Sequence, residues 1–340
     1  DTRVVNLAGG TLSLAGNASS PTTETTGALL LYAGQSRVEA TRTSGQSTTL
    51  GFSTLTRLGA GAVLEFAGDG TVKFSSAANT NGILGGYTVI GNDWAYLDGS
   101  GNVAAFSAYA PNLTSGATTD NVRLTSSQTL VSANTTRNSL SLDPSGGDFT
   151  LNLGASGNVL KLTSGGLLTT GTGNATISGG QLTSNNGSRD LVAFVRGNLL
   201  IESPLVNVTN TVGPVTTTSS VSLTKAGEGT LRLAGENTYS GETRVLAGTL
   251  SVAGGAAIPD TSVVSLGVGA TLRLGGSTET VGGLSGTGLV FFEDGALTIG
   301  GAGLSGSPTI SLGNGRLTVA SAATTDFGGS ISGAGGLSHF

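Results

Sequence analysis

Apolar residues alternate with polar ones in short runs along the whole chain, and each run ends at Gly, Asn or Ser-Gly. Residues 11–14 (TLSL) and 149–153 (FTLNL) are two examples. A period of two is typical of strands that bury one face, and glycines and asparagines mark the turns between them. Because helical periodicity is almost absent, the pattern predicts an all-β chain.

One strand-like phrase, a leucine followed two positions later by another apolar residue, returns along the last third of the chain. It begins at Leu231, Leu250, Leu272, Leu297 and Leu317, at intervals of 19, 22, 25 and 20 residues. A coil of this length cannot bury its own apolar face and needs a similar neighbour above and below. We therefore predict a parallel β-helix (β-solenoid) with coils of about 19–25 residues, lateral loop insertions and one inward-facing ladder of these five leucines.

No stretch of the chain reads as a linker, so residues 1–340 are interpreted as one continuous solenoid segment of a longer chain. Within it we expect decorated coils over 1–84, an aromatic lateral loop or flap over 85–110, degenerate coils over 111–222, and the most regular repeats over 223–340. Residues 1–7 already alternate like a strand, and 333–340 begin a repeat without completing it. Both ends are expected to pair with further coils of the same chain or with head-to-tail copies.

Composition narrows the possible partners. Charged residues make up only 10% of the chain, against a usual level of about 25%. The net charge is −5, and the 15 lysines and arginines are scattered. Nucleic acid is not an expected partner, since binding of phosphates needs clustered positive charge. The absence of cysteine excludes disulfides and thiolate metal sites.

Candidate catalytic chemistry is sparse. The single histidine, His339, lies next to the last residue, which argues against a Ser-His-Asp group. Enzymes that cleave polysaccharides need two convergent carboxylates, whereas Glu228, Glu236 and Glu242 lie within one coil and do not recur in the next. We therefore predict no enzyme activity and no catalytic, cofactor or metal residues, and retain a β-helix polysaccharide lyase or hydrolase as the alternative.

Trp94, Tyr96 and Asp98 are the candidate ligand-binding residues. They lie in the segment that gathers the only tryptophan with several other aromatic residues. Aromatic faces stack on sugars, so this segment could bind a glycan; the competing interpretation is that the rings cover an apolar flank of the solenoid. The stretch from Asp98 to Asn102 lacks the later glutamate of a calcium loop and is interpreted as a turn.

Residues 227–252 (GEGTLRLAGENTYSGETRVLAGTLSV) resemble the passenger-associated repeat of autotransporters, also called the autotransporter-associated β-strand repeat. With this resemblance, 223–340 is interpreted as a passenger-associated repeat region. The residues assigned a structural role in the repeats are Gly229, Thr230, Leu231, Leu233, Asn237, Thr238, Tyr239, Gly241, Gly248, Thr249, Leu250, Leu272, Leu297 and Leu317.

The resemblance implies a passenger located outside the cell, or on the surface, of a bacterium with an outer membrane, and export with an outer-membrane translocator. It implies a non-catalytic, structural solenoid: the shaft of a surface fibre or adhesin. Two alternatives stay open at this point, the polysaccharide enzyme and an adhesin that binds a host or environmental glycan through the Trp94 segment.

Overall fold

The computed structural model describes residues 2–323 and 326–340; Asp1, part of the expected N-terminal strand, lies outside them. Apart from one short 3-10 turn, η1 (Pro144–Gly146), every regular element of the described residues is a strand, and nearly all pairs within the coils are parallel. The predicted all-β parallel solenoid is confirmed. Among the described residues, no helix has the length and apolar character needed to cross a membrane.

The chain packs as two compact units, one up to Tyr109 and one from Ala110 onward. The first unit begins with three coils, each of which contributes one strand to each of three parallel sheets. The strands of these sheets are β1 (Val5–Leu7), β4 (Leu29–Leu31) and β7 (Leu55–Arg57); β2 (Gly10–Ala15), β5 (Gly34–Thr41) and β8 (Ala62–Ala67); and β3 (Thr22–Thr25), β6 (Thr48–Phe52) and β9 (Thr71–Phe74).

The core of the first unit is a stack of equivalent positions. Leu12 pairs with Val38, and Val38 with Phe66, in successive rungs of one sheet. Phe52 and Phe74, from the neighbouring sheet, stack with ring centroids 5.4 Å apart. Each ladder position repeats once per coil, so equivalent apolar residues of successive coils stack on one another and together fill the interior.

Residues 85–110, expected as a lateral loop or flap, contain three short strands. β10 (Thr88–Ile90) adds to β8 in parallel, and β11 (Asp93–Leu97) and β12 (Val103–Ala105) follow in antiparallel order. Alternation along β11 places Ala95 and Leu97 in the core of the first unit. The segment therefore continues the sheet, and its reversal of direction ends the parallel ladder of this unit.

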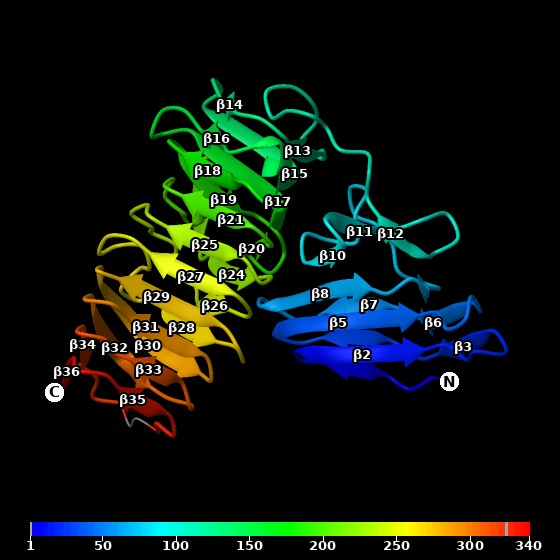
Figure 1. Ribbon diagram of the computed structural model, residues 1–340. Helices are drawn as coiled ribbons and strands as arrows, with labels where there is room; N and C mark the ends of the chain where they lie inside the picture. Colours follow the sequence, from blue (N-terminus) through cyan, green and yellow to red (C-terminus); the bar gives the residue numbers. More distant parts are fainter. Residues whose placement is uncertain (1, 324–325) are drawn as a thin grey trace. The chain divides into compact units, whose positions relative to one another are not determined.

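The second unit is built on two long sheets whose strands pair in parallel (Figure 1). The main path of the first sheet is β13 (Asn121–Leu124), β15 (Asn134–Leu142), β17 (Val159–Thr169), β20 (Asp190–Val195), β24 (Ser222–Ala226), β26 (Thr243–Val245), β28 (Val263–Leu266), β30 (Thr278–Gly286), β32 (Ala296–Leu304), β34 (Arg316–Val319) and β36 (Gly336–His339), with β19 (Gln181–Ser184) also on β17. The second sheet is β14 (Gln128–Thr129), β16 (Phe149–Asn152), β18 (Asn174–Ser178), β21 (Asn198–Ile201), β25 (Thr230–Leu233), β27 (Thr249–Val252), β29 (Thr271–Gly275), β31 (Leu289–Phe292), β33 (Thr309–Ser311) and β35 (Ser330–Ser332).

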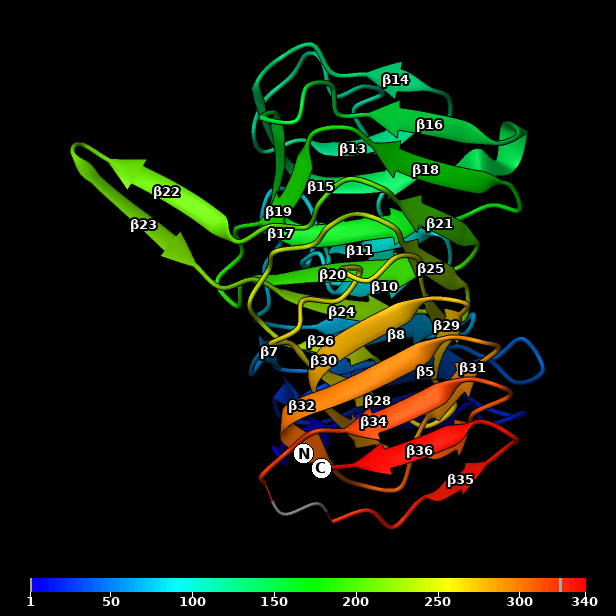
Figure 2. The same ribbon diagram turned by 90° about the vertical axis from the view of Figure 1, so that its left-hand side faces the viewer.

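One antiparallel hairpin, β22 (Val208–Val212) and β23 (Val215–Ser219), leaves the coils of the second unit. Figure 2 shows it projecting away from the two stacked sheets of that unit. The sequence had indicated only degenerate coils here. A Gly-Pro pair between two alternating runs was the local signal for a hairpin turn.

The leucine ladder is partly as predicted. Leu231, Leu250 and Leu272 pair in register along the second sheet, and the line then continues through Val290. The prediction of a single ladder is wrong for Leu297 and Leu317, which lie in β32 and β34 of the first sheet. All five leucines are fully buried. The same phrase occurs on two sides of the coil, so its return interval cannot say which side a given copy occupies.

Candidate functional site

The corners of the repeat are set by glycines. Gly248 has φ +63°, and a Cβ there would lie 2.5 Å from the carbonyl oxygen of Gly229 and 2.6 Å from that of Gly227. Only glycine accepts this left-handed conformation and this approach of one coil to the previous one. Beyond the corner, Thr230 and Thr249 pair in adjacent rungs, each just before an inward leucine.

The polar stretch that includes Asn237 and Thr238 is the third side of the coil and not a surface loop. Asn237 is buried; its Oδ1 accepts a hydrogen bond from the Leu205 N–H at 2.7 Å, and its Nδ2 donates to the Ala257 carbonyl. The Thr238 N–H donates to the Leu205 carbonyl at 2.9 Å. Leu205 lies in the coil before and Ala257 in the coil after, so one amide side chain ties three successive coils together.

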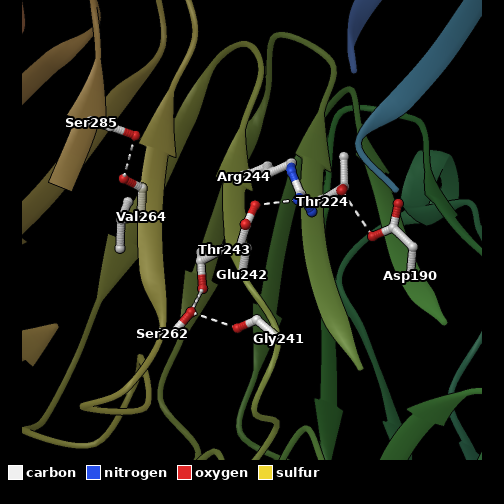
Figure 3. Close-up of polar contacts among 9 residues, drawn as sticks. All are labelled: Asp190, Thr224, Gly241, Glu242, Thr243, Arg244, Ser262, Val264 and Ser285. Carbon is white, nitrogen blue, oxygen red and sulfur yellow. Dashed lines mark hydrogen bonds and ion pairs between the residues drawn. The ribbon is translucent and has the colours of Figure 1, made fainter. Parts of the chain in front are cut away.

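The hydroxyl of Tyr239 begins a buried series of hydrogen-bonded hydroxyl groups. Figure 3 shows the part of this series that includes Thr243 and Ser262. The Tyr239 hydroxyl lies 2.6 Å from Thr243 Oγ1, which lies 2.9 Å from Ser262 Oγ, and Ser262 donates to the Gly241 carbonyl at 2.9 Å. Burial raises the pKa of Tyr239 above its ordinary value. The phenol therefore stays neutral and acts as a structural hydrogen-bonding group.

Lys225 points into the interior at a position that sequence reasoning did not single out. It pairs in register with Ala193 and Val245, which belong to the apolar core. Its Nζ donates to the carbonyls of Ala226 at 3.1 Å, Gly227, and Ala247 at 2.9 Å. Burial lowers the pKa of Lys225 to about 7. The sequence feature that could have revealed this buried group is a lysine at an inward position of an alternating run.

Glu279 is a second buried group that the sequence did not reveal. One carboxylate oxygen accepts from the Ile258 N–H, and Oε2 has no hydrogen-bond partner among the described residues. Burial raises the pKa of Glu279 to about 7, against the opposing effect of the Ile258 bond. A perturbed carboxyl group can mark a catalytic site, but this side chain is only 1% exposed and offers no access to a polymer substrate.

Two further polar contacts lie along the first sheet, one between adjacent strands and one within a single rung (Figure 3). Thr224 Oγ1 donates to Asp190 Oδ1 at 2.8 Å, and Arg244 forms an ion pair with Glu242. Each of these carboxylates is engaged by a residue on its own or an adjacent strand. Within residues 2–323 and 326–340, no group of three or more His, Cys, Asp or Glu side chains could hold a metal ion.

The three candidate ligand residues do not form an aromatic sugar platform. Trp94 is fully buried, so its ring presents no face to a ligand, and Tyr96 packs edge-on against Phe106 at 6.1 Å. Asp98 Oδ1 accepts the N–H groups of Ser100 at 2.8 Å and Asn102 at 2.9 Å. Hydrogen bonds from Asn102, the largest cause, lower the pKa of Asp98, as expected for a carboxylate that closes its own turn.

Comparison with known proteins agrees with the repeat geometry. The model of the passenger-associated-transport-repeat family matches residues 223–252, the stretch that supplies Lys225, Asn237 and Tyr239. The adhesin BmaC autotransporter of Brucella suis biovar 1 (strain 1330) is 29% identical over an alignment of 273 residues that covers 73% of this chain and 7% of that relative. No solved structure matches the chain. In its parallel solenoid and its matched repeat, the chain is similar to the passengers of autotransporters.

Proposed function

We propose that this chain is a non-catalytic stalk of an autotransporter adhesin, which holds adhesive parts of the passenger away from the bacterial surface. The family implies an extracellular or cell-surface location in a Gram-negative bacterium and an outer-membrane translocator as the export partner. The chain spans 7% of the length of the curated relative that it matches. The adhesive activity that the relative's name describes is therefore part of the proposal.

The observation that carries the stalk role is the unbroken parallel ladder of the second unit. The main path of its first sheet runs through eleven strands. At a strand spacing of about 4.8 Å, such a stack extends over roughly 50 Å. Every rung adds backbone hydrogen bonds and buried apolar side chains between the same two sheets. Repetition of one unit along an axis produces length and stiffness without a dedicated active site.

The polar side chains inside the repeat support a mechanical role. Asn237 and Lys225 both satisfy backbone groups of neighbouring coils, and each therefore resists the separation of two coils. Separation would break these hydrogen bonds and expose their groups to water, at a net cost of about 0.5–1.5 kcal/mol for each neutral bond. These bonds act across the coil boundary, which is where a pulling force along the axis would act.

A β-helix polysaccharide enzyme is the alternative function, and it requires two accessible carboxyl groups facing one groove. Glu279 is enclosed, and Asp190 and Glu242 are engaged in contacts with neighbouring side chains. These three carboxyl groups therefore do not supply the accessible pair that the alternative requires.

Pulling single molecules of the chain from its two ends tests the stalk. We expect the second unit to resist force and then to unfold in steps of one or a few coils. Unfolding of that unit at forces too low to detect would contradict the proposal. In a parallel assay, incubation with acidic and neutral polysaccharides should release no products; turnover that is lost on replacement of a single carboxylate would favour the enzyme.

A further inference from the structure

A polar groove of about 370 Å³ lies at the base of the hairpin formed by β22 and β23. Its floor comes from three adjacent strands, β15, β17 and β19, and its wall from the chain that enters β22. Figure 2 shows the hairpin leaving the coils beside β17 and β19. None of the candidate residues from the sequence lies in this groove.

The floor consists of two rows of outward-facing side chains. One row contains Val159 and Gln181, which pair in register, and the other contains Lys161 and Thr183. Leu160 lies between these two rows on β17, and its side chain points into the core. Each row crosses three strands and so presents a side chain about every 4.8 Å.

The wall is held against the floor by hydrogen bonds. Thr183 Oγ1 donates to the Val206 carbonyl at 2.8 Å, and Lys161 Nζ donates to Asn210 Oδ1 at 3.2 Å. The Asn210 amide also donates to Asn185 Oδ1 at 3.3 Å. These contacts give the groove a fixed side, and a ligand would meet an existing surface with little ordering cost.

The lining has the chemistry of a site for a hydroxyl-rich anion. Amide and hydroxyl side chains, which both donate and accept hydrogen bonds, surround Lys161, the one charged lining residue, and no carboxylate is among the described lining residues. An ammonium group has three donors, and only one is used on Asn210. The positive groove is a local exception in a chain with a net charge of −5.

We propose that this groove binds an acidic saccharide, with its carboxylate on Lys161 and its hydroxyl groups on the amides and hydroxyls of the two rows. The inference goes beyond the proposed stalk role, because it assigns a ligand class and a site to this chain itself. The two valines, Val159 and Val206, supply apolar contact for the C–H face of a sugar ring. The groove contains no aromatic ring among its described residues, so we expect moderate affinity.

Isothermal titration calorimetry of the full chain tests the proposal with two probes, a hyaluronan hexasaccharide and an oligogalacturonate. Each is compared with the same oligosaccharide after reduction of its carboxylates to neutral groups. The variants are Lys161→Met and Gln181→Ala, and the matched control is Lys73→Met in the first unit, outside the groove. Circular dichroism confirms that each variant keeps the fold of the parent.

We expect Lys161→Met to weaken binding of an acidic probe by about tenfold or more, as for loss of a hydrogen bond to a charged group. It should weaken binding of the neutral form much less, because only the acidic form presents a carboxylate to Lys161, whereas Gln181→Ala should weaken both forms to a similar degree and Lys73→Met neither. Equal affinity for acidic and neutral forms, an equal effect of Lys161→Met and Lys73→Met, or no binding of either acidic probe at millimolar concentration would overturn the proposal. The pulling experiment does not depend on this groove, so a failure here leaves the stalk to be judged separately.

Discussion

Replacing the buried Asn237 with alanine should destabilise the repeat far more than replacing an exposed asparagine of the same unit. The side chain is 6% exposed and satisfies the Leu205 N–H in the coil before and the Ala257 carbonyl in the coil after. Alanine supplies neither partner, and both backbone groups then stay buried without a hydrogen bond. At about 1–3 kcal/mol for each group, the loss is about 2–6 kcal/mol.

The control is Asn314→Ala, because Asn314 also makes a side-chain bond to the neighbouring coil, to Asp294 Oδ1 at 3.1 Å, but is exposed. Water replaces that partner, so the free energy of unfolding should change by about 0.5 kcal/mol or less. The two variants separate the effect of burial from the effect of deleting an amide.

Urea unfolding followed by far-UV circular dichroism measures the total change, and amide hydrogen exchange locates it. Solenoids open coil by coil, so protection should fall first at Leu205 and the residues around Ala257. If Asn237→Ala and Asn314→Ala give the same unfolding midpoint, and the Leu205 amide keeps its protection, then the cross-coil amide is not a source of stability and the reasoning is refuted.

Three further predictions concern buried positions. Leu272→Asp should prevent stable folding of the neighbouring coils, since it places an unpaired charge at a fully buried position; a melting temperature equal to that of the parent would show that Leu272 does not face the core. Glu279 has a folded-state pKa of about 7 against an ordinary value of 4.5, so the folded chain binds the proton more tightly than the unfolded chain. The stability contributed by this group should therefore fall as pH rises between these two values. Glu279→Gln should flatten the pH dependence of the urea midpoint over that range. Lys225 has a folded-state pKa of about 7 against an ordinary value of 10.5, so the unfolded chain binds the proton more tightly and stability should rise with pH between these values. Lys225→Met should remove this rise. If the rise in stability with pH persists in the variant, another group is its source.

The sequence by itself determined the class of fold. Alternation over short runs is a local property of strands, and the return of a leucine phrase every 19–25 residues reflects the need of each coil for a similar neighbour. The corner glycines were also readable, because a left-handed φ and close backbone contact exclude other residues, as at Gly248. The family resemblance rested on the same local phrase, and the repeat match covers it.

Only the tertiary structure decided which side of the coil each phrase occupies. Leu250 and Leu297 have the same local pattern, yet they lie in different sheets, because strand pairing depends on the total length of the turns between them. Pairing also decided that Trp94 is buried and that Asn237, in a polar stretch, faces the interior. Burial of a polar or aromatic side chain is a property of its neighbours in adjacent coils, and those neighbours are defined by register, which a single stretch of sequence does not contain.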